Sequence, residues 1–177
     1  MLLLFCRDVW NEPDNSGYSS DLIAPLLEQV FSWCREANPT QPLTTPLWKD
    51  RPWNDFSRLN SLQRIQIESS DIISFHNYGN LNDLTDAVES LEGYGKPLVC
   101  TEYMARGAGS YFNPNLGYLK DASVCAFNWG LVSGLTQTIY AWDSYNNPNP
   151  YEGIDDPDPW FHGNFFAVFF LVFCVVF

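Results

Sequence analysis

Apolar runs and amphipathic segments alternate along most of this 177-residue chain. Short apolar runs that end in polar or aromatic residues predict strands, and these are expected at residues 2–10, 42–48, 71–76, 97–102 and 123–129. Between them, apolar residues recur at three- and four-residue spacing, which predicts helices at residues 22–37, 59–68, 83–94 and 115–121.

The segment at residues 22–37 has the clearest helical period. Asp21 is expected to cap its N-terminus, and Asn38-Pro39 is expected to end it. The spacing of its apolar residues predicts a single buried face, formed by Ile23, Leu26, Leu27, Val30, Phe31 and Cys34.

Strict alternation of strands and helices predicts an α/β fold with a parallel sheet and right-handed crossovers. In such sheets, functional residues gather at the carboxyl ends of the strands. Two predicted strands end in a glutamate next to aromatic residues, Glu12 after Trp10 and Glu102 before Tyr103. Two carboxyl groups that converge at one end of a sheet are the arrangement that glycoside hydrolysis requires.

Composition narrows the possible functions. Aromatic residues make up 16% of the chain, with 7 Trp and 9 Tyr, and such rings either stack on sugars or fill a core. The net charge of -12 argues against binding to nucleic acid or to an anionic membrane surface. The 5 cysteines and 2 histidines lack metal-ligand spacing, so neither structural zinc nor a disulfide framework is expected. The acidic run at residues 155–158 is either a cation ligand set or a solvated loop.

These motifs resemble the superfamily of retaining (β/α)8-barrel glycoside hydrolases, the clan of cellulases, mannanases and β-galactosidases, and in particular its family 5-like members. Asn11-Glu12-Pro13 is similar to the element after the fourth strand of that family, which supplies the acid/base. Glu102 corresponds to the glutamate that ends the seventh strand and acts as the nucleophile. The resemblance covers residues 9–162 and implies hydrolysis of a β-linked glycan by double displacement.

Two further elements follow the family order. His76-Asn77-Tyr78 is similar to the His-x-Tyr element of the sixth strand, and Trp129 to the tryptophan under the sugar site. The resemblance implies that Tyr78 donates a hydrogen bond to Glu102 and that Asn11 binds the sugar 2-hydroxyl. For His76 it implies contact with the substrate or support of the glutamates, and a packed structural histidine is the alternative.

The implied mechanism sets requirements on both glutamates. Glu102 has to be ionised, and Glu12 has to be protonated near neutral pH, aided by the charge of Glu102 and by aromatic walls. Trp48, Trp53 and Trp142 either line outer sugar subsites or pack in the protein. A carbohydrate is the expected partner, and the mechanism requires no metal and no organic cofactor.

Counted from the Asn-Glu-Pro element, the chain holds only strands four to eight, so the expected fold is a partial barrel over residues 1–162. Five parallel strands do not close an eight-stranded barrel. The apolar run at residues 163–177 lacks amphipathic spacing and is expected to lie outside the fold, as in a truncated form of such an enzyme. As a helix, residues 165–177 would span roughly 20 Å, short of a hydrocarbon core of about 30 Å, so membrane association is not expected. A membrane-binding or partner-binding tail is the alternative.

Two functions remain open at this point. One is a glycosidase, and the other is a catalytically inactive, carbohydrate-binding or interaction remnant of one. The apolar residues at the start of the chain lack the basic flank and length of a signal peptide. The compartment is therefore not fixed, although the family is often secreted.

Overall fold

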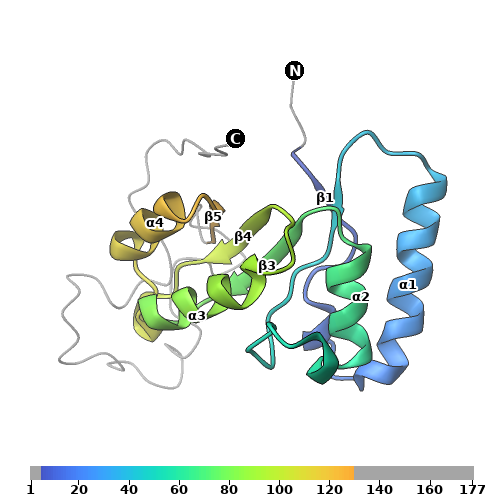
Figure 1. The fold of residues 1–177 in the computed structure, drawn as a ribbon, viewed down its shortest axis with the longest axis horizontal. Coiled ribbons are helices and arrows are strands. Elements are labelled where there is room, and N and C mark those ends of the chain that lie inside the picture. The colour runs from blue at the N-terminus through green and yellow to red at the C-terminus, as the bar shows by residue number, and fades with distance from the viewer. Residues whose placement is uncertain (1–4, 130–177) are drawn as a thin grey trace, which may run out of the picture. The chain divides into compact units, whose positions relative to one another are not determined.

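The computed structural model describes residues 5–129 of the chain. The chain divides into two compact units. The first comprises Met1–His76 and Asp86–Val99, and the second comprises Asn77–Thr85 and Cys100–Phe177. Strands and helices alternate through the described residues, as Figure 1 shows, so the predicted α/β fold with parallel strands is confirmed.

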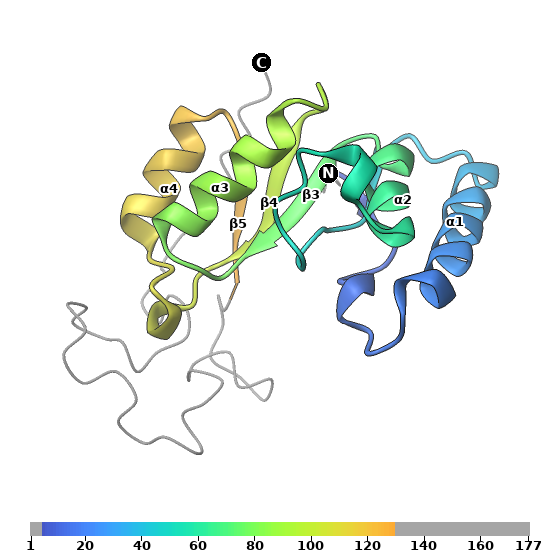
Figure 2. The same ribbon diagram turned by 60° about the horizontal axis from the view of Figure 1, so that its bottom comes forward.

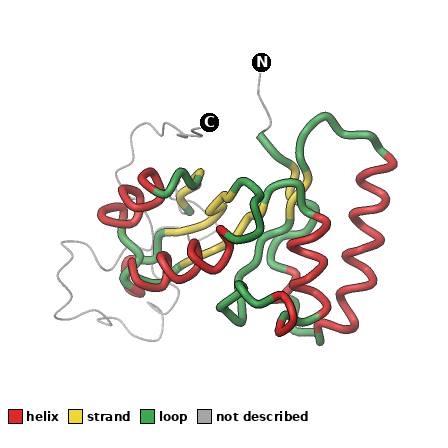
Figure 3. Tube along the Cα trace, in the orientation of Figure 1, coloured by secondary structure: helices red, strands yellow, loops and turns green. Residues whose placement is uncertain are grey.

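The first unit contains a parallel pair of short strands, β1 (Arg7–Asp8) and β2 (Leu43–Thr44). Arg7 lies opposite Leu43 in this pair, and the amide of Arg7 donates to the carbonyl oxygen of Pro42 at 2.9 Å. Beyond β2, Leu47 forms a parallel bridge with Phe75 of β3 (Ile73–Asn77). Figure 3 shows these strands in yellow. The bridge fixes the register of β3, all of whose residues are buried.

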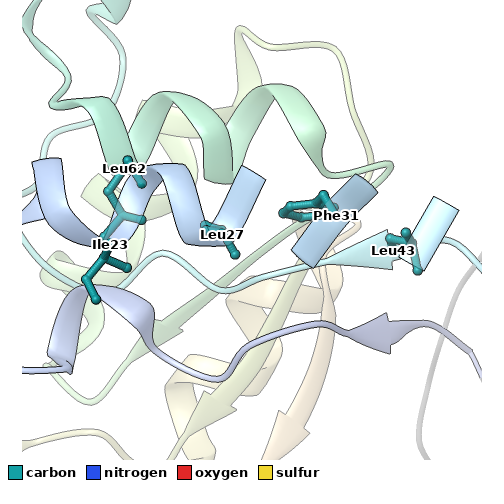
Figure 4. Close-up of a cluster of buried hydrophobic side chains, with 6 residues drawn as sticks. Ile23, Leu27, Phe31, Leu43 and Leu62 are labelled. Carbon is teal, nitrogen blue, oxygen red and sulfur yellow. The ribbon is translucent and has the colours of Figure 1, made fainter. Parts of the chain in front are cut away.

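Two helices of the first unit, α1 (Ser20–Glu36) and α2 (Ser61–Ser69), lie side by side. Their apolar faces and β2 form one core cluster, which Figure 4 shows in close-up. Its buried members are Ile23, Ala24, Leu27, Phe31, Leu43 and Leu62. The predicted buried face of α1 is therefore confirmed at every fourth residue, as a helix with 3.6 residues per turn requires.

Both ends of α2 are satisfied by side chains. At the start, Asn60 and Gln63 form a capping box, in which the amide of Gln63 donates to Asn60 Oδ1 at 2.9 Å. At the end, the ammonium group of Lys96 donates to the carbonyl oxygens of Ile67 and Ser70, each at 2.7 Å. The helix predicted at residues 59–68 is thus confirmed and begins two residues later than expected.

The second unit contains the ends of β3 and of β4 (Leu98–Tyr103) and the start of α3 (Leu81–Glu92). It also contains all of α4 (Phe112–Asp121) and β5 (Cys125–Asn128). The strand order is β3-β4-β5, and Figure 2 shows these strands side by side. Consecutive strands are joined by α3 and α4, as in βαβ units. The strands and helices predicted between residues 71 and 129 are confirmed within a few residues.

Two predictions near the N-terminus are wrong. The first strand was expected over residues 2–10, but only Arg7–Asp8 is paired in the described part. The ladder is short because Pro42 and Pro46 flank β2 and have no amide hydrogen to donate. Asp21 does not cap α1, since the N-cap is Ser19 and Asp21 accepts a hydrogen bond from Ser61 Oγ at 2.9 Å.

One residue of the predicted apolar face of α1 is also exposed. The side chain of Leu26 lies about 100° around the helix from Leu27, and Leu26 is 46% exposed. Leu22 and Trp33 lie near the same direction and are exposed as well.

Among residues 5–129, the sheets contain five strands in groups of two and three, and no closed barrel is formed by these residues. The apolar run at residues 163–177 and the expected site residue Trp142 lie outside the described residues. The helices found between residues 5 and 129 are too short or too polar to cross a membrane.

Arg35 and Asp71 connect the end of α1 to the strand layer. The guanidinium group binds both carboxylate oxygens of Asp71 at 2.7 Å, and Asp71 Oδ2 also accepts the amide of Leu43 at 2.7 Å. The hydrogen bonds from Arg35 hold the pKa of Asp71 below its usual value and outweigh the opposing effect of burial. This carboxylate therefore stabilises the fold above its unfolded-state pKa of about 3.9, and the contribution is lost as pH falls through the lower folded-state pKa.

We expect Asp71→Asn to lower the free energy of unfolding at pH 7 by roughly 1 kcal/mol, because the pair is partly exposed to solvent. The difference from the unsubstituted chain should shrink toward pH 2, where Asp71 is protonated. Urea unfolding at several pH values measures both effects. The exposed Asp86→Asn serves as the matched control, and a difference that does not depend on pH would contradict the assignment.

Candidate functional site

The backbone of Glu12 has a left-handed conformation, with φ 45° and ψ 58°. It precedes a short 3-10 turn at Pro13–Asn15 that joins β1 to α1, and the amide of Asn15 donates to the carbonyl oxygen of Glu12 at 2.9 Å. Non-glycine residues in this region cost on the order of 1 kcal/mol or more and cluster at functional sites. The conformation fixes the direction in which this carboxylate leaves the turn.

The carboxylate of Glu12 contacts a buried histidine of the same unit. Glu12 Oε1 lies 2.7 Å from His76 Nδ1, and Glu12 Oε2 accepts the side-chain amide of Asn15 at 3.1 Å. The side chain of His76 is 1% exposed and that of Glu12 is 15% exposed. β3 positions His76, whose amide donates to the carbonyl oxygen of Leu47 at 2.9 Å.

This environment changes the ionisation of Glu12. Burial raises the pKa of Glu12, but the hydrogen bond and charge of His76 act in the opposite direction, with smaller contributions from Asn15 and Lys49. The net pKa of Glu12 is lower than its usual value. The lowered pKa contradicts the expectation that Glu12 is protonated near neutral pH, because the contact with His76 favours the carboxylate form.

The second unit brings Glu102 together with two aromatic residues. The hydroxyl of Tyr78 donates a hydrogen bond to Glu102 Oε2, the contact that the family resemblance implied. The ring of Tyr78 meets the ring of Trp129 edge to face, with centroids 6.5 Å apart. The amide of Trp129 donates to the carbonyl oxygen of Tyr103 at 2.9 Å, which places Trp129 beside the end of β4.

Tyr103, next to Glu102, faces the opposite way along the strand. Its side chain is fully buried, and burial raises the pKa of its hydroxyl. Tyr103 is therefore a neutral core residue at physiological pH, and Tyr78 is the tyrosine whose hydroxyl contacts Glu102.

The remaining expected site residues have different surroundings. Asn11 is exposed, and Trp48 is half-buried with the ammonium group of Lys49 5.2 Å from its ring centre. Trp53 is fully buried, and its indole nitrogen donates to the carbonyl oxygen of Lys49 at 3.1 Å. Of the two alternatives for Trp53, the structure therefore supports packing, and Trp53 is not a sugar subsite.

Sequence reasoning missed two residues of the Glu12 turn. Asn15 binds the carboxylate of Glu12, and Asp14 Oδ2 accepts the amides of Trp48 and Lys49 at 2.9 and 2.8 Å. Both residues directly follow Asn11-Glu12-Pro13, so their position in the motif was the available signal.

The first unit offers Glu12 and His76 as neighbouring ligand atoms for a metal. Catalytic zinc sites use three protein ligands, and this pair supplies two. In the second unit, Glu102 is bonded to a tyrosine hydroxyl, which is a donor to the carboxylate. These contacts are typical of carboxylates that act as acid, base or nucleophile.

Comparison with known proteins gives a loose structural likeness. No protein-family model matches the sequence, and no curated protein matches it. Among solved structures, the chain is similar to a GH128 (subgroup V) exo-β-1,3-glucanase from Cryptococcus neoformans, with 19% sequence identity and a TM-score of 0.37. The similarity covers 64% of this chain and 46% of the glucanase chain, so the chain spans less than half the length of that enzyme. Likeness at this level does not assign a family.

We expect His76→Gln to raise the pKa of Glu12, because it removes the positive charge and leaves the effect of burial less opposed. Titration of the Glu12 carboxyl carbon by NMR, assigned with Glu12→Gln, measures this pKa. Asn15→Ala removes only the weaker hydrogen bond and should raise the pKa less. An unchanged pKa in His76→Gln would show that the contact does not persist in solution.

Proposed function

We propose that this chain is the catalytic-side portion of a retaining β-glycoside hydrolase, with Glu12 as acid/base and Glu102 as nucleophile. The observation that carries the proposal is the pair of contacts made at the end of β3. His76 binds Glu12, and Tyr78, two residues later, binds Glu102. Each unit thus holds one of the two glutamates against a partner from the His76-Asn77-Tyr78 segment, and both contacts support the proposed roles. The retaining mechanism needs carboxyl groups about 5–5.5 Å apart.

In the proposed first step, a carboxylate oxygen of Glu102 attacks the anomeric carbon and forms a covalent glycosyl ester. The glycosidic bond breaks, and its oxygen leaves with a proton delivered by Glu12. In the second step, Glu12 takes a proton from water, the water oxygen attacks the anomeric carbon, and the carboxylate of Glu102 is released. The hydrogen bond from Tyr78 keeps Glu102 oriented for attack.

The lowered pKa of Glu12 changes the source of the proton in this proposal. We infer that the acid is the Glu12–His76 pair and not Glu12 alone. In this proposal the pair holds one proton between Glu12 Oε1 and His76 Nδ1. The 2.7 Å contact allows the proton to pass to Glu12 as the leaving oxygen gains charge.

The other site residues receive roles as binding groups. Trp129 is proposed as the platform on which the sugar stacks, and Trp48 as an outer subsite. Asn11 is proposed to bind the sugar 2-hydroxyl. Trp142, outside the described residues, keeps its proposed subsite role from the sequence. The proposal treats residues 1–162 as strands four to eight of a barrel and residues 163–177 as outside the fold.

The lowered pKa of Glu12 also favours a second candidate, a carbohydrate-binding remnant without turnover. A carboxyl group that stays ionised is a poor acid, yet it still accepts hydrogen bonds from sugar hydroxyls. The two candidates share a carbohydrate ligand and differ in whether a covalent bond to Glu102 forms.

A 2-deoxy-2-fluoro β-glycoside with a dinitrophenyl leaving group distinguishes the two candidates. The fluorine slows breakdown of the glycosyl ester, so an active enzyme should accumulate an adduct that peptide mass spectrometry finds on Glu102. Glu102→Gln should abolish the adduct, and Glu12→Gln should still form it because this leaving group needs no acid. The exposed Glu89→Gln is the control. Binding of saccharides without any adduct would favour the remnant.

We expect Tyr78→Phe to slow adduct formation roughly tenfold or more, since a hydrogen bond to a charged group is worth about 1.5–3 kcal/mol. The substitution keeps the ring that packs against Trp129, so the local fold should persist. Stopped-flow release of dinitrophenolate measures the rate. Tyr18→Phe, in which the changed hydroxyl is on an exposed side chain, should match the unsubstituted chain. Equal rates for both variants would remove Tyr78 from the mechanism.

A further inference from the structure

Asp14 has no role in the proposed chemistry, yet its side chain joins the Glu12 turn to a distant loop. One of its oxygens, Oδ2, accepts two successive backbone amides, from Trp48 at 2.9 Å and from Lys49 at 2.8 Å. These amides belong to the loop that follows β2, 34 and 35 residues away in sequence. A single carboxylate oxygen therefore fastens the turn to a distant loop.

The contact is made in a largely buried place. Oδ1 of Asp14 is inaccessible to solvent and has no hydrogen-bond partner in the structure described over residues 5–129. Burial raises the pKa of Asp14, the charge of Glu12 raises it further, and the amides of Lys49 and Trp48 oppose both effects. Hydrogen bonds to a carboxylate in such surroundings are stronger than those at the surface.

A second anchor lies on the other side of Glu12. The hydroxyl of Thr45, which is buried, donates to the carbonyl oxygen of Trp10 at 2.7 Å. Glu12 thus lies midway between two anchors, Trp10 and Asp14, and both are bound by residues 45–49. A strained left-handed residue persists only where its surroundings determine its conformation. The hydrogen bonds to Trp10 and Asp14 hold the backbone on both sides of Glu12. Of these two residues, only Asp14 is bound through its side chain.

We propose that Asp14 is the positioning residue of the Glu12 turn, holding Glu12 in its left-handed conformation and its carboxylate against His76. This inference rests on the proposed function in that Glu12 is the acid/base. Asp14 touches neither sugar nor water in the reaction and acts only through Glu12. The same carboxylate fixes the backbone of Trp48, so it also sets the distance between the acid/base and that proposed subsite.

The direction in which the pKa of Glu12 changes when Asp14 is substituted tests this role. If the turn kept its shape in Asp14→Ala, the loss of a neighbouring acidic group would lower the pKa of Glu12 or leave it unchanged. If the turn is released, Glu12 loses the hydrogen bond and charge of His76, and its pKa rises toward the usual value. We expect a rise in Asp14→Ala, measured by NMR titration of the Glu12 carboxyl carbon. His76 and Lys49 are the charged groups that act on the pKa of Glu12, and both are unchanged in this variant.

The conservative variant separates hydrogen bonding from charge. The carbonyl oxygen of Asp14→Asn can still accept both amides, so the turn should hold and the pKa of Glu12 should not rise. Asp14→Glu keeps the charge but moves it by one methylene, and it should raise the pKa as Asp14→Ala does. It also serves as the test should Asp14→Ala fail to fold. Asp86→Ala, at an exposed acidic residue of α3, is the matched control and should change nothing.

Enzyme kinetics gives a second test. A residue that only stabilises the fold would affect substrates with good and poor leaving groups equally. Hydrolysis of a substrate with a poor leaving group needs the acid, and kcat/KM should fall about 100-fold in Asp14→Ala, as expected for a misplaced catalytic group. Adduct formation from the dinitrophenyl 2-fluoro glycoside needs no acid and should stay within about threefold. Asp14→Asn should retain most of the activity on both substrates.

The outcomes separate the two proposals. A lowered or unchanged pKa of Glu12 in Asp14→Ala and Asp14→Glu would overturn the role of Asp14, even if the unsubstituted chain forms the adduct. Absence of the adduct in the unsubstituted chain would overturn the proposed function, while the titration would still decide whether Asp14 positions Glu12. Equal losses on both substrates would show general disruption of the fold and would also overturn the inference.

Discussion

The contact between Glu12 and His76 is the interaction on which the candidate site depends. It joins residues 64 positions apart, and it pairs a carboxylate on a strained turn with an imidazole that is almost completely buried. Burying an ionisable group without a partner is costly, so each member of this pair stabilises the position of the other. Because His76 lies on a fully buried strand, the contact also fixes where the turn after β1 must lie within the first unit.

β3 supplies the register that this contact requires. Leu47 pairs with Phe75, and the amide of His76 donates to the carbonyl oxygen of Leu47. A slip of one residue would turn His76 away from Glu12 and place Phe75 there instead. Tyr78 directly follows β3 and binds Glu102 in the second unit. A short stretch of chain, His76-Asn77-Tyr78, thus contacts both of the proposed catalytic carboxylates.

The electrostatics of the two glutamates follow from these different partners. Glu12 faces a group that can carry positive charge, while Glu102 faces a neutral hydroxyl. The histidine favours the ionised form of Glu12, so an acid role has to involve the pair as a unit. Asp14 adds a second carboxylate two residues away, bound to backbone amides that hold the turn. These contacts combine a turn held by backbone amides with a carboxylate held against an imidazole.

Local patterns in the sequence determined the order and type of most elements. The helical period fixed α1, and apolar runs fixed β3, β4 and β5, because burial of one face or of a whole strand leaves a periodic signature. The same patterns placed Glu12, His76, Tyr78 and Glu102 at strand ends. The contact between Tyr78 and Glu102 was expected from the resemblance to the glycoside hydrolase superfamily, and the structure shows it.

Only the tertiary structure decided the remaining properties. The left-handed conformation of Glu12, the two amides bound by Asp14 and the burial of Trp53 depend on contacts with segments that local periodicity does not reveal. Leu26 is exposed because another side of α1 packs against the core. The apolar character of the residue does not show which side of the helix is buried. The pKa of Glu12 is the clearest case, because an ionisation equilibrium is set by the nearest charges and donors in space, whatever their distance along the chain.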